Sequence, residues 1–389
     1  MSTTPTTTPT IHWSEDRSTP AAQSLSARWH SESAAPPPRR VVVADDRTKA
    51  ATAYQLACEG TALLWRGDFH NARRLLQAMS RRIDRKSSPI RPDAAPAESF
   101  RLHRRARGHR ARVLGKLVVL LEDDHSLSLR RAPDVRRACT EAYGPPRGDR
   151  AVSLTELLGV IGAHQWREKG VEVPALGDGV RIHPHYGVFS PVRGEYIDLV
   201  ARAPLPPAAR EGRAFDLGTG TGVLAALLVR RGLAHVVATD IGPRALECAR
   251  DNAGRLSLAD RVEVTGPALY PDGRADLVVC NPPWLPARPT STVEQGVYDP
   301  DGTMLHGFLH GLADHLRPGG EGWLVLSDLA EHLGLRTRAE LLTAIGSAGL
   351  RVTGRLDTSP HHPRARDTTD PLHRARAAEV TSLWRLTPD

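Results

Sequence analysis

Asn281, Pro282, Pro283 and Trp284 are consecutive residues that together suit the binding of a planar nitrogen group. The side-chain carbonyl of Asn281 and the backbone carbonyl of Pro282 can accept two hydrogen bonds from one NH2 group. The two prolines stiffen the loop, and neither has a backbone N–H that would compete for those acceptors. The indole of Trp284 can stack on a planar group, and its π face favours a developing positive charge.

Two loops earlier in the chain suit the binding of a nucleoside. An apolar segment leads into a loop with glycine at every second position: Gly218, Gly220 and Gly222. Glycine has no Cβ, so the backbone can turn tightly there and approach a ligand closely. A second apolar segment, 236–239, ends at Asp240, whose carboxylate can accept hydrogen bonds from both hydroxyls of a ribose. Val223 stands where the dinucleotide fingerprint needs its third glycine, so the loop is of another kind.

These three motifs, in this order and each at the carboxyl end of a predicted strand, resemble those of class I S-adenosylmethionine-dependent methyltransferases. They are similar in particular to the branch that methylates planar nitrogens through an Asn-Pro-Pro-aromatic motif. The resemblance implies S-adenosyl-L-methionine as the cofactor and Asn281, Pro282 and Trp284 as catalytic residues. The cofactor-binding residues that it implies are Asp216, Gly218, Gly220, Gly222, Asp240 and Asn281. A doubly wound domain that binds another nucleotide, or none, is the alternative.

Methyl transfer to nitrogen suits this residue set chemically. The sulfonium methyl is already activated, so the enzyme mainly has to align a nucleophile with the carbon–sulfur bond. An amide or aryl-amine nitrogen is a poor nucleophile because its lone pair is delocalised, and binding both of its hydrogens localises that pair. Acceptors that are fixed before the reaction need little reorganisation. No strong base is required, and none is apparent in the sequence.

The elements expected to position these motifs form an α/β fold. Helical and strand patterns alternate through residues 201–389, which we interpret as the catalytic, cofactor-binding domain. Its seven predicted strands correspond to the seven-stranded, doubly wound, Rossmann-like sheet of methyltransferases. The resemblance implies that the last two strands, over 350–356 and 379–386, form an antiparallel hairpin.

Three further regions are expected before this domain. Residues 1–46 are rich in Thr, Pro, Ser and Ala, and predict a disordered tail. Residues 47–150 predict a small helical accessory domain for substrate recognition, with Asp68 capping one helix and an earlier helix running through 54–65. The capped helix has an apolar stripe formed by Phe69, Ala72, Leu76, Met79 and Ile83. Residues 151–200 predict a connector made of a helix and a hairpin.

Two segments resemble parts of the glutamine methyltransferases of release factors and ribosomal proteins. One is the proline-bearing stretch 185–196, which lies over the cofactor in that family, and the other is the stretch 298–305. The substrate-binding candidates are Phe189, Pro191, Arg193, Pro283, Trp284 and Tyr298. One position departs from the family: Ala268 replaces the usual acid that accepts the adenine amine. Asp272 and a backbone carbonyl are the alternatives for that contact.

The favoured methyl acceptor is the side-chain amide of a glutamine in a translation-associated protein. The segment 298–305, the proline before the glycine loop and the layout of the amino-terminal region all point to it. A base amine of rRNA, tRNA or DNA is one alternative, since such enzymes share the motif, and a natural product is another. The intact motif at 281–284 argues against a non-catalytic binding protein.

The charge of the chain is compatible with an acidic partner. The formal net charge is +8 and the pI is near 9.7, which fits RNA or a ribosome, although an Arg-rich genomic composition gives the same bias. A predicted helix from Arg101 to Lys116 carries many arginines that could contact RNA phosphates. A solvated helix face is the alternative.

Neither a membrane span nor a metal site is expected. No apolar run approaches the roughly 20 residues of a spanning helix, and no signal pattern opens the chain. Cys58, Cys139, Cys248 and Cys280 lie far apart without metal-ligand spacing, which suggests reduced thiols and a cytoplasmic location. We interpret Cys280 as a buried strand-end thiol. The pair His361 and His362 predicts a surface loop.

Overall fold

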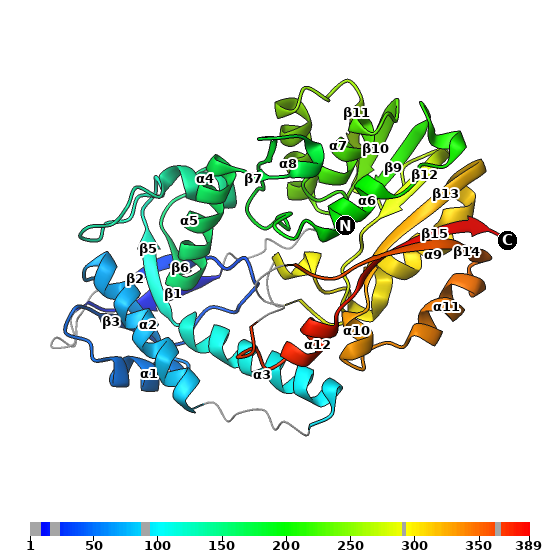
Figure 1. The fold of residues 1–389 in the computed structure, drawn as a ribbon. Helices are drawn as coiled ribbons and strands as arrows, with labels where there is room; N and C mark the ends of the chain where they lie inside the picture. Colours follow the sequence, from blue (N-terminus) through cyan, green and yellow to red (C-terminus); the bar gives the residue numbers. More distant parts are fainter. Residues whose placement is uncertain (1–8, 16–23, 87–93, 290–292, 362–366) are drawn as a thin grey trace, which may run out of the picture. The chain divides into compact units, whose positions relative to one another are not determined.

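The computed structural model describes residues 9–15, 24–86, 94–289, 293–361 and 367–389, which form two compact units (Figure 1). The first unit comprises Met1–Ile90 and Leu102–Gln165, and the second comprises Arg91–Arg101 and Trp166–Asp389. The predicted boundaries at residues 46, 150 and 200 therefore need correction. The 151–200 connector is divided between the two units, and the catalytic unit includes residues from Trp166 onward.

The first unit is built around a six-stranded sheet in the order β1-β2-β6-β5-β4-β3. Its strands are β1 (Thr10–Trp13), β2 (Leu25–Trp29), β3 (Val41–Ala44), β4 (Ala62–Trp65), β5 (Leu117–Leu121) and β6 (Arg150–Ser153). Strands β3, β4 and β5 are parallel, and β6 is antiparallel to β5. Continuous apolar segments such as β4 and β5 suit strands that are buried on both faces.

Helices of the first unit are α1 (Ala50–Cys58), α2 (Phe69–Lys86) and α4 (Arg136–Tyr143). Helices α3 (Pro96–Leu114) and α5 (Leu154–Lys169) each have residues in both units. Asp68 caps α2 as predicted, because its Oδ1 accepts hydrogen bonds from the backbone N–H groups of His70 and Asn71 at 2.9 and 3.3 Å. The predicted apolar stripe of α2 is buried.

The expected disordered tail is wrong for the described part of 1–46, which contains β1, β2 and β3. Ile11, Trp13 and Trp29 are buried there. Composition averaged over 46 residues conceals strands of four or five residues. The helical accessory domain also needs correction, since a six-stranded sheet carries its helices and Leu63–Trp65 belong to β4. Such a short apolar run has no period that separates strand from helix. Residues 1–8 and 16–23 lie outside the described residues.

The second unit contains a seven-stranded sheet in the order β11-β10-β9-β12-β13-β15-β14. Its strands are β9 (Arg213–Leu217), β10 (His235–Thr239), β11 (Val262–Thr265), β12 (Ala275–Cys280), β13 (Leu316–Ser327), β14 (Leu350–Thr358) and β15 (Thr381–Pro388). Strands β9 to β13 are parallel, whereas β15 is antiparallel to both β13 and β14. The predicted α/β class, the seven strands and the final hairpin are confirmed.

Helices cover both faces of this sheet. The helices of this unit are α6 (Glu195–Arg202), α7 (Val223–Arg230), α8 (Pro243–Arg255), α9 (Thr303–His315), α10 (Leu329–His332), α11 (Arg338–Ser347) and α12 (His373–Ala378). Adjacent β9 residues Ala214 and Phe215 belong to different buried clusters, because side chains alternate along a strand. Helices α6 and α7 pack in the first cluster, and α9 and α11 pack in the second. The sheet is therefore doubly wound.

Other elements of the second unit are short. Strands β7 (Val171–Glu172) and β8 (Arg181–Ile182) form the predicted antiparallel hairpin. The 3-10 turns are η1 (Pro174–Leu176), η2 (Pro207–Ala209), η3 (Val293–Gly296) and η4 (Pro300–Gly302). None of the described helices combines the length and the apolar character that a membrane span requires.

One edge of the seven-stranded sheet brings the three sequence motifs together. Strand β9 lies between β10 and β12, and its last residue, Leu217, pairs with Thr239 of β10 and Cys280 of β12. These three strands are parallel, so the loops that follow them start side by side. The glycine loop, Asp240 and Asn281 all leave from this edge, as expected for the ligand edge of an open α/β sheet.

Candidate active site

The glycine loop follows β9, and its three glycines share a backbone conformation but differ in their surroundings. All three glycines have left-handed backbones, with φ of +69° at Gly218, +54° at Gly220 and +80° at Gly222. A Cβ on Gly218 would collide with Met304, and a Cβ on Gly222 would lie 3.2 Å from the Cα of Ala249. A Cβ on Gly220 would meet no atom within 4 Å. Gly220 is therefore the loop position that borders open space.

Asp216 holds the loop in shape. Its side chain is buried, and Oδ2 accepts hydrogen bonds from the Thr219 hydroxyl at 2.6 Å and from the Ala225 N–H at 3.0 Å. Burial raises the pKa of Asp216 to about 6, and these two donors oppose the rise. The carboxylate is thus directed at the loop and the first turn of α7, while its predicted contact with the cofactor stays a prediction.

Asp240 follows β10 and faces the same loop. Its Oδ2 accepts a hydrogen bond from the Gly220 N–H at 3.1 Å, and its Oδ1 accepts one from the Gly242 N–H at 2.8 Å. Burial raises the pKa of Asp240, and the N–H donors act in the opposite direction. Carboxylate oxygens have further lone pairs, so Asp240 can still accept hydroxyl donors from a ligand.

Ile241 was missed by sequence reasoning. Its side chain is 76% exposed, an unusual exposure for an isoleucine that directly follows a buried strand and its acid. A flat apolar ring could pack against it. Ala268 lies beside this position, because its N–H donates to the Asp240 carbonyl at 3.3 Å. Asp272, the alternative acid for the adenine amine, is exposed. The position of Ile241 after the ribose acid is the sequence signal that could have identified it.

The catalytic motif follows β12, where Asn281 and Trp284 contact each other. The Trp284 Nε1–H donates a hydrogen bond to the Asn281 Oδ1 at 2.9 Å. An indole nitrogen only donates, so this contact requires the carbonyl oxygen of Asn281 to face the ring. The Trp284 ring also packs against both buried clusters of the sheet. Pro282 is buried and Pro283 half-buried, which keeps the loop rigid.

Arg193 lies over the Trp284 ring, with its Cζ 5.1 Å from the ring centroid. Glu379 positions it, because the Oε1 of Glu379 accepts a hydrogen bond from Arg193 at 3.1 Å and another from the Ser327 hydroxyl at 2.7 Å. Glu379 is buried and lies 186 residues from Arg193 along the chain. Sequence reasoning found Arg193 but missed Glu379 and Ser327, since no local pattern joins positions so far apart.

The remaining substrate candidates lie around the motif. Phe189 packs against Gly296, where an added Cβ would lie 2.7 Å from the phenylalanine Cβ. Pro191 is buried. Tyr298 forms an isolated bridge with Leu285, the residue after Trp284. The segment 298–305 therefore adjoins the catalytic motif.

Asp299 links this segment to the glycine loop. Its Oδ2 accepts hydrogen bonds from the backbone N–H groups of Met304 and Leu305 at 2.9 and 3.2 Å, which fixes the start of α9. Burial raises the pKa of this carboxyl. Met304 in turn lies against Gly218. The first turn of α9 thus supports the loop that borders the open space.

Neither Cys280 nor His361 adds chemistry to the site. Cys280 is buried as predicted, and burial raises the pKa of its thiol well above the usual range, so it is not a thiolate nucleophile. His361 donates its backbone N–H to Glu195 at 2.8 Å. His362 lies outside the described residues.

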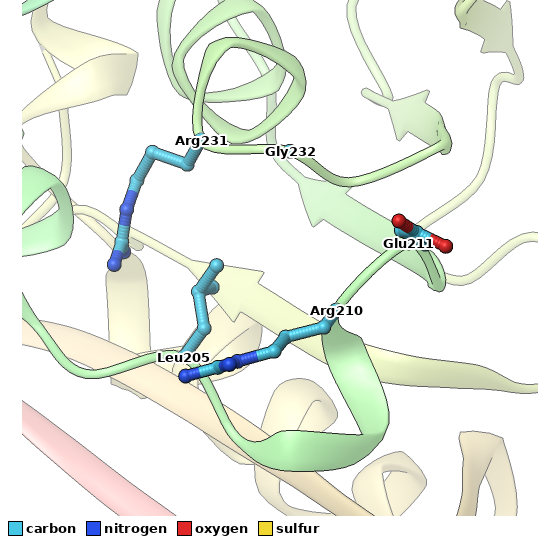
Figure 2. Close-up of a pocket in the computed structure, with 5 residues that line it drawn as sticks. All are labelled: Leu205, Arg210, Glu211, Arg231 and Gly232. Carbon is cyan, nitrogen blue, oxygen red and sulfur yellow. The ribbon is translucent and has the colours of Figure 1, made fainter.

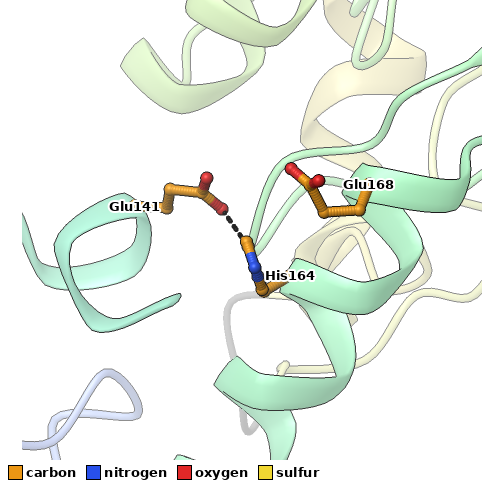
Figure 3. Close-up of side chains that lie close together, drawn as sticks. All are labelled: Glu141, His164 and Glu168. Carbon is orange, nitrogen blue, oxygen red and sulfur yellow. Dashed lines mark hydrogen bonds and ion pairs between the residues drawn. The ribbon is translucent and has the colours of Figure 1, made fainter. Parts of the chain in front are cut away.

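Side chains of metal-ligand type also meet on α4 and α5 (Figure 3). In the first unit, the Nδ1 of His164 lies 2.8 Å from the Oε2 of Glu141. Glu168 comes one turn later on α5, beyond the division between the units. A pair of ligands is short of the three or four that a zinc site uses, so this pair is an ordinary hydrogen bond or ion pair.

A hollow of about 440 Å³ in the second unit lies far from the motif (Figure 2). Its lining residues are Leu205, Arg210, Glu211, Arg231 and Gly232. These residues come just before β9, or between α7 and β10, where the chain enters parallel strands. The hollow therefore lies at the amino-terminal edge of the sheet. Arg231 is occupied there by the backbone carbonyls of Val200 and Ala203. This hollow is distinct from the edge that carries Asn281.

Comparison with known proteins relates this geometry to a family. Residues 179–344 match the methyltransferase small domain. The release factor glutamine methyltransferase of Cereibacter sphaeroides is 36% identical over 157 residues, which cover 36% of this chain and 55% of that protein. The enzyme of the same name from Mycolicibacterium smegmatis is 41% identical over 125 residues, or 31% and 44% of the two chains. The chain thus spans about half the length of these relatives.

Two further proteins share smaller or more distant similarity. The ribosomal protein L11 methyltransferase of Vibrio cholerae is 39% identical over 90 residues, covering 23% of this chain and 30% of that protein. A solved S-adenosylmethionine-dependent methyltransferase from Geobacter sulfurreducens, in complex with S-adenosyl-L-homocysteine, is 20% identical. Its alignment covers 56% of this chain and 97% of the other, with a TM-score of 0.35.

Proposed function

We propose that this chain, whose residues 179–344 match the methyltransferase small domain, is a class I S-adenosylmethionine-dependent methyltransferase that methylates a planar nitrogen, with a protein glutamine side-chain amide as the favoured acceptor. One observation carries this proposal. Asn281 and Trp284 leave the same sheet edge as the glycine loop and Asp240, so a planar acceptor and the cofactor would meet there. Transfer of the methyl group from sulfur to nitrogen mainly needs alignment of the two, and the nitrogen then loses one proton to solvent.

The residues at this edge fit S-adenosyl-L-methionine, which supplies an activated methyl group when bound. Gly220 leaves the space that a nucleoside or its sulfonium chain needs. Asp240 presents a carboxylate for ribose hydroxyls, and Ile241 presents an exposed apolar surface for a base. Asp216 maintains the loop that separates these groups from the sheet.

The acceptor nitrogen would be held by two carbonyl oxygens. The hydrogen bond from Trp284 orients the Asn281 amide and occupies one lone pair of Oδ1, which leaves the second for an acceptor N–H. The backbone carbonyl of Pro282 offers the other acceptor. Trp284 thus has two roles in this proposal, as a stacking surface and as the group that fixes the Asn281 side chain. Prearranged acceptors of this kind are usually the main source of rate enhancement in such sites.

Several features favour glutamine as the acceptor. Two relatives are named release factor glutamine methyltransferases, and others are named for ribosomal protein L11. The segment 298–305, which resembles theirs, adjoins the catalytic motif. A translation protein as acceptor would also place the enzyme with ribosomes in the cytoplasm.

A base amine of a nucleic acid is the second candidate, and basic helices in the first unit favour it. The exposed arginines of α2 and of the described part of α3 in this unit are Arg73, Arg74, Arg81, Arg85, Arg105, Arg107 and Arg112. Such a surface could bind phosphates of RNA. It also suits a protein acceptor that sits beside ribosomal RNA, so the predicted RNA contact through Arg101 to Lys116 is part of either proposal.

Transfer of a labelled methyl group from the cofactor to a cell lysate tests the acceptor class. The labelled products are divided and treated with ribonuclease or with protease, and Asn281→Ala supplies the background. We expect label that survives ribonuclease, is lost to protease and appears as a methylated glutamine after complete digestion. Label lost to ribonuclease would favour the base amine, and label on neither polymer would point to a small molecule. Purified release factors and ribosomal protein L11 then serve as defined acceptors.

A further inference from the structure

Arg150 of the first unit is a buried cation at the start of a strand. It is the first residue of β6 and pairs with Leu121, the last residue of β5, on one side and with Arg28 of β2 on the other. Its side chain is only 6% exposed. The guanidinium lies over the ring of Tyr143, with Cζ 5.5 Å from the ring centroid. A charge at this depth ordinarily requires a partner.

The charged groups that act on Arg150 electrostatically are two further cations, Arg28 and Arg147. Within the described part of the chain, no hydrogen-bond acceptor or carboxylate contacts the Arg150 guanidinium. Burial lowers the pKa of Arg150, and the charges of Arg28 and Arg147 lower it further. Arg28 is held close by its hydrogen bond to the Gly148 carbonyl at 3.1 Å. Like charges on facing strand positions are destabilising unless an anion lies between them.

His125 supplies a second group without a partner. It follows β5 with a left-handed backbone (φ +68°), and its side chain is completely buried. Neither ring nitrogen has a hydrogen-bond partner in the described residues. Its ring meets that of Tyr143 edge-on, with centroids 6.5 Å apart. Burial, together with the charge of Arg150, lowers the pKa of His125. Orphaned buried polar atoms of this kind indicate an absent water or ion.

The carboxylates nearest to Tyr143 are already committed. Glu156 accepts hydrogen bonds from the Tyr143 hydroxyl at 3.1 Å and from the Glu32 N–H at 3.0 Å. Glu32 lies 2.9 Å from the Nε2 of His30, whose ring packs against Tyr143 at 4.5 Å. Glu156 is thus engaged by Tyr143 and by the Glu32 backbone, and Glu32 is engaged by His30. They leave the positive charge of Arg150 uncompensated.

We propose that Arg28, Arg147, Arg150 and His125 form a binding site for a phosphate group, either free phosphate or a phosphate monoester. Guanidinium groups bind phosphate oxygens through paired, charge-assisted hydrogen bonds. Arg147 is exposed and gives access from solvent, whereas Arg150 and His125 are buried. The cluster lies where β5 ends, and β3 and β4 end at the same edge, as in other α/β ligand sites.

A monoester suits this cluster better than a phosphodiester of a nucleic-acid backbone. A monoester carries about −1.5 to −2 charges at pH 7 and three terminal oxygens. A diester carries one charge and has two such oxygens. Three guanidinium groups and an imidazole therefore find enough acceptors and compensating charge only on the monoester or on free phosphate.

Calorimetry and thermal unfolding of the full chain test this site with inorganic phosphate as the probe, against chloride at equal ionic strength. We expect phosphate to raise the unfolding midpoint of the wild type above its value in chloride. Arg150→Gln should abolish that increment and weaken phosphate binding by at least tenfold. In chloride it should leave the midpoint unchanged or raise it, because an uncompensated buried charge is removed. Arg39→Gln, which removes an exposed arginine from the same unit, is the matched control and should retain the increment.

Two further measurements separate this proposal from simple charge effects. His125→Phe keeps the ring contact with Tyr143 and removes both nitrogens, so it should weaken phosphate binding while the protein stays folded. The dinucleotide UpU, whose only phosphate is a diester, should bind at least tenfold more weakly than phosphate. Equal midpoints in phosphate and chloride, or equal losses in Arg150→Gln and Arg39→Gln, would overturn the site. UpU binding as tight as phosphate would overturn the monoester assignment.

Discussion

The two sheets of this protein tie the ends of two parallel strands together in similar ways, but the space beside these strand ends differs. In the first unit, Asp46 follows β3, and its Oδ1 accepts a hydrogen bond from the backbone N–H of Asp68, after β4, at 3.0 Å. In the second unit, Asp240 follows β10, and its Oδ2 accepts one from the N–H of Gly220, after β9, at 3.1 Å. In each unit, therefore, a hydrogen bond from a backbone N–H to an aspartate carboxylate links the ends of two neighbouring strands.

Side chains fill the space at the ends of β3 and β4, which we call the closed edge, whereas the ends of β9 and β10, which we call the open edge, border free space at Gly220. Asn71 and Arg130 also donate to the Asp46 carboxylate. A Cβ on Gly67 would lie 2.5 Å from Oδ1 of Asp46, whereas a Cβ on Gly220 would meet nothing within 4 Å. An acid after a parallel strand is therefore insufficient evidence of a ligand site. The loop beside it must also leave space.

Two other buried acids, Asp68 after β4 and Asp216 in β9, differ in the same sense. Arg131 donates a hydrogen bond to Asp68 at 2.6 Å and lowers the pKa of that carboxyl to about 2. Among the described residues, Asp216 accepts hydrogen bonds from Thr219 and Ala225, neither of them a cation, and burial raises its pKa to about 6. The closed edge is consolidated by ion pairs. The open edge keeps an acid whose ionisation is disfavoured.

The largest expected effect of a substitution is on catalysis at the open edge. Asn281→Ala removes an acceptor for the reacting nitrogen and should lower kcat by about 10²–10³-fold, with cofactor affinity nearly unchanged. Asn71→Ala makes the same change at the closed edge and should leave kcat unaltered. Steady-state kinetics and calorimetry measure both. A parallel loss of cofactor affinity in Asn281→Ala would make Asn281 a structural residue instead.

Trp284→Phe tests whether the hydrogen bond from Trp284 to Asn281 contributes to turnover. It keeps an aromatic ring but removes the N–H that orients Asn281, so kcat should fall less than in Asn281→Ala. The KM for the acceptor should change little, because the stacking surface persists. A kcat equal to that of the wild type would show that the hydrogen bond between Trp284 and Asn281 has no role in turnover.

The two buried acids should give opposite pH dependences of stability. The folded-state pKa of Asp216, about 6, lies above its ordinary value of 3.8, so its contribution to stability is greatest below about pH 4 and is lost as the pH rises through about 6. Asp216→Asn should remove this loss, on the order of 2–3 kcal/mol. Asp68 has a lowered pKa, so its contribution is present above pH 3.8 and is lost as the pH falls towards 2.

Denaturant unfolding between pH 2.5 and 8 measures these slopes. Asp216→Asn should flatten the profile between pH 4 and 6, and Asp68→Asn should flatten it only below pH 4. An unchanged slope between pH 4 and 6 in Asp216→Asn would mean that the pKa of Asp216 in the folded protein lies near its ordinary value.

Asp240 and Asp46 each join two neighbouring loops, but we expect Asp240 to support cofactor binding and Asp46 to support stability. Asp240→Ala removes a charged acceptor for ribose hydroxyls and should cost about 1.5–3 kcal/mol of cofactor binding, or roughly 10- to 150-fold in affinity. Asp46→Ala should lower stability by about 1–2 kcal/mol through lost hydrogen bonds and leave cofactor affinity intact. Calorimetry and thermal unfolding of both variants separate the two effects, and reduced cofactor affinity in Asp46→Ala would contradict the distinction.

Substitutions of Gly220 at the open edge and Gly67 at the closed edge should show the smallest difference between the two edges. Gly220→Val fills the open space and should cost about 1–3 kcal/mol of cofactor binding, as overpacking does elsewhere. Gly67→Ala should instead destabilise the first unit, because the added Cβ meets Asp46. Gly319→Val controls for backbone strain, since Gly319 has a positive φ of +76° and open surroundings at the far end of β13. Equal cofactor affinities in Gly220→Val and Gly319→Val would rule out Gly220 as a cofactor neighbour.

Local sequence was sufficient to predict most of the second unit. Strands β9, β10 and β12 are largely apolar runs, and the motifs at Gly218, Asp240 and Asn281 directly follow them. Parallel strands joined by helices have few possible arrangements, so the order of motifs along the chain was enough to bring them to one edge. The same reasoning failed for the first unit. Its strands are short, lie in a region of tail-like composition, and pair across long stretches of chain.

The amino-acid sequence by itself determined the sheet of the catalytic unit, its nucleoside loop and the Asn-Pro-Pro-Trp motif, because each of these is encoded within a few consecutive residues. Only the tertiary structure decided that Glu379 holds Arg193 over Trp284, that Asp216 is directed at its own loop, and that Arg150 is buried among other cations. Those facts depend on contacts between residues up to 186 positions apart. Which side chains far apart in the sequence are buried and paired depends on the packing of the whole unit. Local hydrophobic periods and motif spacings carry no information about that packing.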